Sequence, residues 1–130
     1  MNPKSSKITL KSLDQAKKYR IGGYKGDVIS DYLIERGFNV LTMANDQLNP
    51  RKLMLDQIDL WATDGLSGPY IASEAEDITG LKTVLKFNST PLYMAVNKET
   101  DPEIISALNK AFKQVTDSGE AKSISDAYLQ

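Results

Sequence analysis

A short apolar run constrains the fold of this chain more than any other stretch. Residues Ile58 to Ala62 are apolar apart from Asp59, and a second acid, Asp64, stands two residues beyond the run. The run is too short for a helix and is typical of a buried strand in a parallel sheet. In open α/β sheets, ligands bind beyond the carboxyl ends of the strands. We therefore predict that the Asp64 carboxylate faces a ligand.

The side chains of this stretch also have structural interpretations, which stay open at this point. Asp64 precedes a predicted helix, so it is also placed to cap that helix as the N-cap residue. Trp61 lies in a strand that is buried on both faces, so we expect it in the core, with ligand stacking as the alternative. Asp59 begins the strand, and we expect its carboxylate to be satisfied within a turn.

Strand and helix patterns alternate along the chain and predict an α/β fold with a parallel sheet. Asp27 and Asp101 are the predicted N-caps of two of the helices, and Ser12 with Gln15 forms a weak capping-box pattern in front of a third. The predicted strands cover residues 20–24, 38–43, 58–62, 81–87 and 92–96. The predicted helices cover residues 12–19, 28–36, 50–55, 66–76, 102–117 and 121–129.

Composition excludes several classes of function. Cysteine and histidine are both absent from the 130 residues, so disulfides, thiolate sites, the usual zinc sites and histidine-based catalysis are excluded. We therefore expect no metal and no cofactor. The 16 basic and 17 acidic side chains are scattered, so no nucleic-acid surface is expected. No apolar run reaches the length of about 18 residues that a membrane span needs, and residues 1–7 lack a signal-peptide core.

A glycine-rich loop, Gly22 to Asp27, precedes the second predicted helix. Such a loop can bind an anion at a helix N-terminus, but a tight turn with Asp27 as a cap explains it equally well. The spacing fits neither a Walker A loop nor a dinucleotide-binding fingerprint. Tyr24 ends the strand and is expected to be exposed towards the same edge as Asp64. The acidic pair of a phospho-receiver, the hydroxyl-rich loop of a flavodoxin and the nucleophile and base of a hydrolase are all missing.

Three stretches, in this order, carry a resemblance to a known family. The first is Ser12-Leu-Asp-Gln-Ala followed by Ile21-Gly22 and then Gly26, and the second is Leu55-x-x-Ile-Asp-Leu-x-x-x-Asp64. The third runs from Val96-Asn-Lys-Glu-Thr-Asp-Pro-Glu through Leu108-Asn109 and Gly119 to Tyr128-Leu129. Together they resemble the type 2 periplasmic binding protein superfamily, specifically the extracellular solute-binding proteins of family 3, which bind polar amino acids.

The resemblance implies a flavodoxin-like open sheet with helices on both faces, forming one lobe of a two-lobed binding protein. Residues 1–88 resemble lobe two, and residues 89–130 resemble the hinge return strand and the C-terminal helices of lobe one. It also implies that the chain is incomplete, because a full member is nearly twice as long. We expect residues 1–130 to form one compact unit.

The resemblance also implies roles for individual residues. Asp64 matches the acid that holds the ammonium group of the ligand, while Gly26, Asp27 and Val28 match the loop whose hydroxyl residues hold its carboxylate. Neither Asp27 nor Val28 carries a hydroxyl. A cationic solute, a differently anchored solute or a degenerate site therefore fits as well as an amino acid.

The implied function is the binding of a small polar, amino-acid-like solute outside the cytoplasm or in the periplasm, for the permease of an ABC transporter. The alternatives are a ligand-sensing domain of a membrane signalling protein and a dehydratase-type enzyme. Since Asp27, Asp64 and Glu74 are the only candidates for proton transfer, we expect no enzyme activity. The apolar face of residues 101–130 further predicts self-association, such as a homodimer formed through exposed lobe-one surface.

Overall fold

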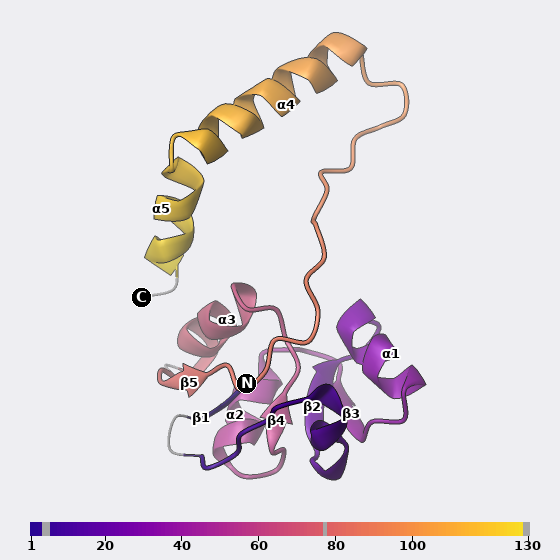
Figure 1. The fold of residues 1–130 in the computed structure, drawn as a ribbon, viewed down its shortest axis with the longest axis vertical. Helices are drawn as coiled ribbons and strands as arrows, with labels where there is room; N and C mark the ends of the chain where they lie inside the picture. The colour runs from indigo at the N-terminus through magenta and orange to yellow at the C-terminus, as the bar shows by residue number, and fades with distance from the viewer. Residues whose placement is uncertain (4–5, 77, 129–130) are drawn as a thin grey trace. The chain divides into compact units, whose positions relative to one another are not determined.

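The structure is a computed structural model that describes residues 1–3, 6–76 and 78–128. The chain divides into two compact units, Met1–Asn88 and Ser89–Gln130. Figure 1 labels the α-helices and strands of the two units, which are described separately below.

The first unit is built on a three-stranded parallel sheet with the strand order β3-β2-β4. β2 (Ile21–Tyr24) is central, with β3 (Val40–Met43) and β4 (Leu60–Trp61) on either side. Ile21 is in register with both Val40 and Leu60. The parallel pairing confirms the α/β class predicted from the alternation of strand and helix patterns.

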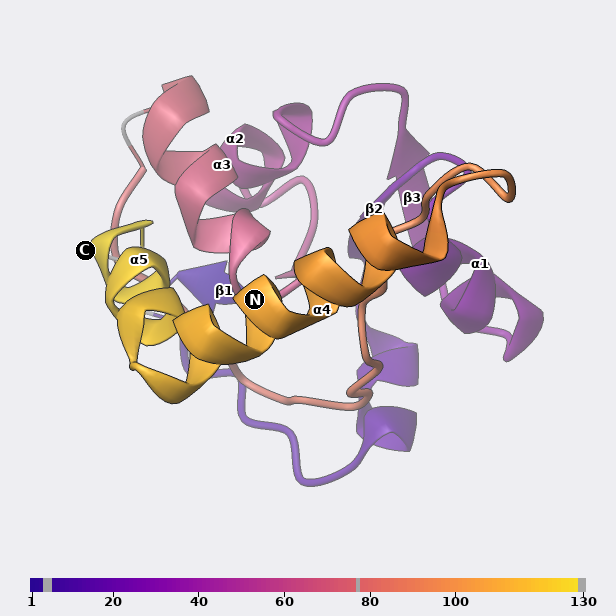
Figure 2. The same ribbon diagram turned by 90° about the horizontal axis from the view of Figure 1, so that it is seen from above.

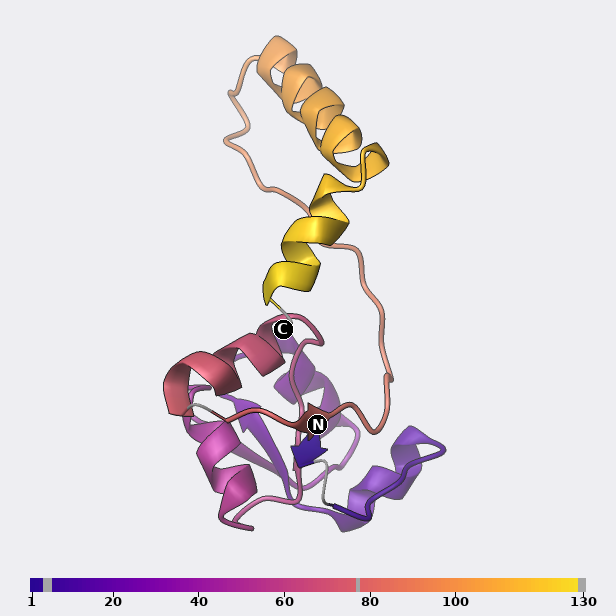
Figure 3. The same cartoon turned by 90° about the vertical axis from the view of Figure 1, so that its left-hand side faces the viewer.

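Helices cover both faces of this sheet. They are the 3-10 helix η1 (Leu13–Lys18), α1 (Val28–Glu35), α2 (Leu48–Met54) and α3 (Ser67–Glu76). Because successive strand residues face opposite sides, Gly23 meets α1 and Gly22 meets α2. Figure 2 shows α2 and α3 side by side, and Figure 3 shows them across the sheet from η1.

The apolar core has two parts, one on each face of the sheet. Trp61, with 1% of its surface exposed, lies on the face of α2 and α3, which confirms its predicted place in the core. On the face of η1 and α1, the buried residues are Ala16, Ile21, Leu33, Phe38, Leu60 and Ala62. On the face of α2 and α3 they are Leu53, Ile58, Trp61 and Ala72.

The two glycines of β2 let both neighbouring helices approach the strand closely. A Cβ on Gly22 would lie 2.4 Å from the side-chain oxygen of Asn49, and one on Gly23 would lie 2.3 Å from Oγ of Ser30. These distances are far below van der Waals contact. The strand glycines are therefore required by the packing of α1 and α2.

The start of the chain extends the sheet region beyond β4. The Met1 amine donates a hydrogen bond to the carbonyl of Trp61, and Trp61 N donates to Met1 O over 2.8 Å. Burial lowers the pKa of this α-amino group to about 5. β1 (Asn2–Pro3) then pairs in antiparallel fashion with β5 (Leu81–Lys82). The predicted strand over residues 81–87 is thus reduced to two residues, because its neighbour, β1, offers only two residues for pairing.

The N-terminal cap of α1 forms as predicted, whereas the capping box predicted at Ser12 does not. Asp27 caps α1 as predicted, accepting a hydrogen bond from Ile29 N at 3.2 Å. The capping box at Ser12 was wrong, because the Ser12 side chain makes no cap bond and Gln15 Oε1 accepts from Lys11 N at 2.8 Å. α2 begins two residues before Pro50. A proline is tolerated there because the first-turn N–H groups of a helix have no intrahelical acceptor.

The second unit contains α4 (Pro102–Asp117) and α5 (Glu120–Tyr128). Asp101 caps α4 as predicted, accepting from Glu103 N at 2.8 Å, and Gly119 separates the helices with φ +81°. The described part of these helices contains no buried residue. Leu129, included in the last predicted helix, lies outside the described residues.

The strand predicted over residues 92–96 is not formed. Leu92 and Tyr93 are 91% and 85% exposed, and the segment has no pairing partner among the described residues. A strand needs a neighbour for its backbone groups, which a sequence pattern alone does not guarantee. Over the described ranges, no helix combines the length and apolar character needed to cross a membrane.

Candidate site at the carboxyl edge of the sheet

The candidate site is the carboxyl edge of the three-stranded sheet in the first unit. Since β2, β3 and β4 are parallel, the loops that follow them emerge at this one edge. The structure thereby brings all five predicted site residues to the same edge: Tyr24, Gly26, Asp27, Val28 and Asp64.

The loop after β2 is a tight turn with exposed side chains. Lys25 N donates to Met43 O at 2.9 Å and Asp27 N donates to Tyr24 O at 3.3 Å, so the backbone of the turn is fixed. Gly26 has φ +77°, which a residue with a Cβ rarely adopts. Tyr24 is 44% exposed and Val28 is 78% exposed, so both side chains are available at this edge.

Asp64 uses one of its oxygens to cap α3. Its Oδ1 accepts hydrogen bonds from Leu66 N at 2.5 Å and Ser67 N at 3.1 Å. Its Oδ2 accepts no hydrogen bond from the described part of the chain, and the residue is exposed. The cap fixes the direction of the carboxylate while one oxygen stays open to a donor from outside.

Asp59 lies at the opposite, amino edge and is fully occupied. Its Oδ2 accepts from Arg20 N at 2.8 Å and from Arg20 Nε at 3.0 Å, and its Oδ1 accepts from Arg20 Nη2 at 2.8 Å. The hydrogen bonds from the Arg20 side chain are the main reason why the pKa of Asp59 lies below its usual value. The Asp59 carboxylate is satisfied, as predicted, but by Arg20, 39 residues earlier in the chain, and not within a turn.

A third acid at the carboxyl edge, Asp46, did not figure among the predicted site residues. Its Oδ1 accepts from Trp61 Nε1 at 3.0 Å and from Asn49 Nδ2 at 2.8 Å, and Asn49 Nδ2 also donates to Gly23 O at 3.1 Å. The signal that would have found it is position: Asp46 follows β3, just as Asp27 follows β2 and Asp64 follows β4.

The same edge carries exposed apolar side chains. Each of them lies at the end of a strand or in or just before the first turn of the helix that follows. They are Tyr24, Val28, Leu48, Leu66 and Tyr70, all at least 40% exposed. Apolar side chains that gather beside polar groups are typical of a binding surface.

The chemistry available here is that of binding. Among residues 1–3, 6–76 and 78–128, no group of three or more carboxylates is placed to hold a metal ion. The open oxygen of Asp64 can accept hydrogen bonds from an ammonium or amide group, and the exposed Tyr24 ring can contact an apolar part of a solute.

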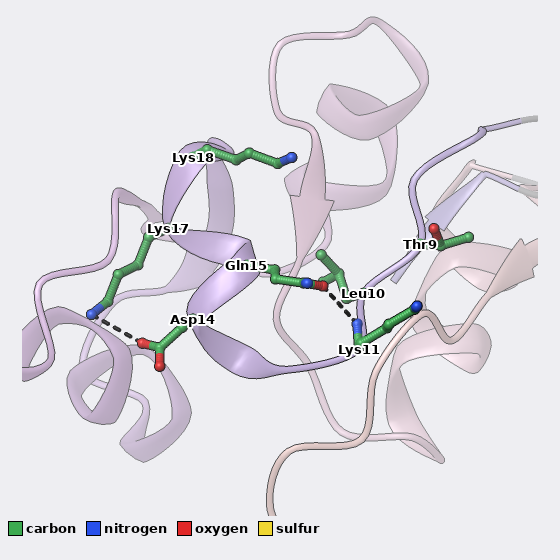
Figure 4. A pocket seen from close by; sticks show the side chains of 7 residues that line it. All are labelled: Thr9, Leu10, Lys11, Asp14, Gln15, Lys17 and Lys18. Atoms are coloured by element: carbon green, nitrogen blue, oxygen red, sulfur yellow. Dashed lines mark hydrogen bonds and ion pairs between the residues drawn. The ribbon is translucent and has the colours of Figure 1, made fainter.

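A surface hollow lies elsewhere, along η1 and the segment before it (Figure 4). Two of its charged side chains pair with each other, since Lys17 Nζ lies 3.1 Å from Asp14 Oδ1. The lining residues are Thr9, Leu10, Lys11, Asp14, Gln15, Lys17 and Lys18. No predicted site residue lines this hollow.

Comparisons with known proteins gave one informative result. A scan against protein-family models and a search of curated proteins found no match. A solved structure, the second substrate-binding domain of a protein described as an amino acid ABC transporter from Streptococcus pneumoniae, matches with a TM-score of 0.73 and 26% sequence identity. The match covers 99% of this chain and 59% of that chain.

This match bears directly on the predicted resemblance. It extends over nearly all of the present chain, and the matched structure is described as a substrate-binding domain. This chain is therefore similar to a lobe of a type 2 periplasmic binding protein, the resemblance that its sequence motifs indicate.

Proposed function

We propose that this chain is the solute-binding part of an ABC transporter, working outside the cytoplasm or in the periplasm and delivering its solute to a membrane permease. The observation that carries the proposal is the coincidence of two findings. The fold matches a substrate-binding domain, and the predicted ligand residues Tyr24, Asp27 and Asp64 all lie at the carboxyl edge of its sheet. That edge is where α/β sheets bind ligands.

We further propose that residues 1–88 are lobe two and residues 89–130 are the returning part of lobe one. The unit boundary after Asn88 supports this division. The chain spans 59% of the length of the matched structure, which supports the proposal that it works within a longer, two-lobed protein. The solute is then held between the carboxyl edge of lobe two and a wall supplied by that longer protein.

The proposed solute is small and carries an amino group. The open oxygen of Asp64 provides an acceptor for an ammonium group, and charge-assisted hydrogen bonds of this kind are the stronger ones. The loop from Gly26 to Val28 offers no hydroxyl for a carboxylate, and Asp27 adds negative charge to it. We therefore place cationic amines beside amino acids as the solutes to test.

The experiment is calorimetric titration of the longer protein with a panel of the twenty amino acids and small aliphatic diamines. We expect at least one of them to bind with a Kd of about 1 µM or tighter, and the 130-residue chain alone to bind the same solute weakly or not at all. Equal affinity in both proteins would contradict the two-lobed proposal. Failure of the whole panel in the longer protein would contradict the solute class.

The helices of the second unit provide a separate test of the lobe assignment. α4 exposes Ile104, Leu108 and Phe112 by 53%, 40% and 70%, so its apolar face lacks cover within the helical unit. We expect the 130-residue chain to self-associate through this face, for instance as a homodimer. Light scattering that shows a strict monomer at high concentration would contradict this expectation.

A further inference from the structure

One side chain is linked to both of the segments that carry the predicted ligand residues, directly to one of them and through Asn49 to the other. Asp46 Oδ1 accepts from Trp61 Nε1 at 3.0 Å, and Trp61 lies three residues before Asp64. The same oxygen accepts from Asn49 Nδ2 at 2.8 Å, and Asn49 Nδ2 donates to the carbonyl of Gly23, the residue before Tyr24. We propose that Asp46 is a positioning residue that holds these two segments in one arrangement.

The burial of its partners makes Asp46 an effective anchor. Asn49 and Trp61 are 0% and 1% exposed, so water does not replace a lost acceptor for either of them. A buried N–H group without an acceptor is costly, which favours the arrangement in which Asp46 accepts from both. The hydrogen bonds from Asn49 and Trp61 to Asp46 are therefore maintained because breaking them leaves buried N–H groups without an acceptor.

The orientation of Asn49 is also fixed from its other side. Its Nδ2 group is engaged with Asp46 and with Gly23 O. Its Oδ1 is buried, has no hydrogen-bond partner among the described residues and lies so close to Gly22 that a Cβ there would be 2.4 Å away. The Asn49 amide cannot rotate without losing its hydrogen bonds to Asp46 and Gly23. A change in the position of Asp46 therefore also affects the end of β2.

Asp46 is suited to this role because only one of its oxygens is used. Its Oδ2 accepts no hydrogen bond from the described residues, and the side chain is half-buried at the carboxyl edge. An asparagine at this position can keep Oδ1 as the shared acceptor and turn its amide towards solvent. An alanine removes the acceptor altogether. Asp46→Asn therefore removes the charge but keeps the acceptor, whereas Asp46→Ala removes both, so comparing them shows which of the two matters.

The first experiment uses the 130-residue chain without a solute and measures amide hydrogen exchange by NMR. The informative amides are Lys25 N, bonded to Met43 O, and Ala62 N, bonded to Gly22 O, while Ile21 N, bonded to Asn39 O at the amino edge, is the internal reference. In Asp46→Ala we expect the protection of Lys25 and Ala62 to fall by about tenfold more than that of Ile21. Asp46→Asn should retain the wild-type pattern.

Two control variants make the result specific. Phe38→Leu weakens the core on the opposite face, so it lowers the protection of all three amides together. Trp61→Phe removes the indole N–H together with part of the buried ring system, and we expect it to loosen Ala62 more than Lys25. A uniform loss in Asp46→Ala, as in Phe38→Leu, would overturn the proposal, and so would an Asp46→Asn variant that behaves like Asp46→Ala.

The second experiment rests on the proposed function and uses the longer protein. With the tightest solute from the panel of amino acids and diamines, we expect Asp46→Ala to weaken binding by about tenfold and Asp46→Asn to weaken it by less than about threefold. If Asp46→Asn weakens binding as much as Asp46→Ala, Asp46 acts through its charge and the positioning role fails. If no solute binds the wild type, the proposed function fails, while the exchange experiment still decides the role of Asp46.

Discussion

Asp59 and Asp64 stand at opposite ends of one strand segment, and their carboxylates have different surroundings. At the amino edge, both oxygens of Asp59 accept hydrogen bonds from Arg20. At the carboxyl edge, Asp64 uses Oδ1 to cap α3 and leaves Oδ2 open. A carboxylate with both oxygens bonded contributes to stability, whereas a carboxylate held by one oxygen still has an acceptor for a further donor.

The two edges also differ in what surrounds the acid. Asp59 is covered by the arginine side chain, and only 28% of its own side chain is exposed. Around Asp64, the edge carries exposed apolar side chains such as Leu66, 53% exposed, and Tyr70, 40% exposed. At the amino edge the acid is satisfied by Arg20 of the same chain, while the carboxyl edge combines an open acceptor oxygen with exposed apolar side chains, which is typical of a binding surface.

The largest effect that separates the two acids is expected in solute binding by the longer protein. Asp64→Asn removes the charge but keeps an N-cap side chain of equal quality. We expect affinity to fall by about 30-fold or more, which corresponds to about 2 kcal/mol for a charge-assisted hydrogen bond. Calorimetry measures this directly, with Asp59→Asn as the matched control. If both variants bind like the wild type, Asp64 is not a ligand residue.

The next largest effect is expected in the stability of the first unit. Asp59→Asn leaves the Arg20 guanidinium without its charged partner and removes one of the two acceptor oxygens. We expect the Tm of the 130-residue chain to fall by about 5 °C, whereas Asp64→Asn should change it by about 1 °C or less. Thermal unfolding followed by circular dichroism tests this. A larger fall for Asp64→Asn would reverse the assignment of the two acids.

The features that could be predicted from the sequence are those that depend on near neighbours in the chain. The caps Asp27 and Asp101 and the β2 and β4 strands are local patterns, and all of them are present. The parallel direction of β2, β3 and β4 follows from their helical connections. This common direction was enough to predict that Tyr24, Asp27 and Asp64 share one edge.

The features that could not be predicted depend on partners distant in the sequence. Residues 92–96 have a strand pattern but no neighbouring strand among the described residues, and Tyr93 is 85% exposed. β5 pairs with the start of the chain, about 80 residues away, which periodicity does not reveal. A buried indole N–H usually has an acceptor, but its identity, here Asp46, depends on which residues the folded sheet brings beside Trp61.

A smaller effect separates the capping role of Asp64 from its proposed ligand role. Asp64→Ala removes the acceptor for Leu66 N and Ser67 N, whereas Asp64→Asn keeps one. We expect Asp64→Ala to reduce the free energy of unfolding by about 1 kcal/mol relative to Asp64→Asn, as for other N-caps. Urea unfolding of the 130-residue chain measures the difference. Equal stability of the two variants would mean that the Asp64 cap contributes nothing to α3.

The smallest effect is the pH dependence of the Asp59–Arg20 pair. Because hydrogen bonds from Arg20 lower the pKa of folded Asp59, the unfolded chain binds a proton at this site more readily. The stabilisation is therefore fully present above the unfolded pKa of about 3.9 and is lost as the pH falls through the folded pKa. We expect the Tm difference between wild type and Asp59→Asn to be constant from pH 7 to about pH 5 and to shrink below about pH 4.

The buried Met1 amine, whose pKa is about 5, titrates in both proteins and cancels from this difference. A Tm difference that stays unchanged to pH 2 would show that Asp59 stabilises the fold without its charge, and the contrast with Asp64 would then rest on hydrogen-bond number alone.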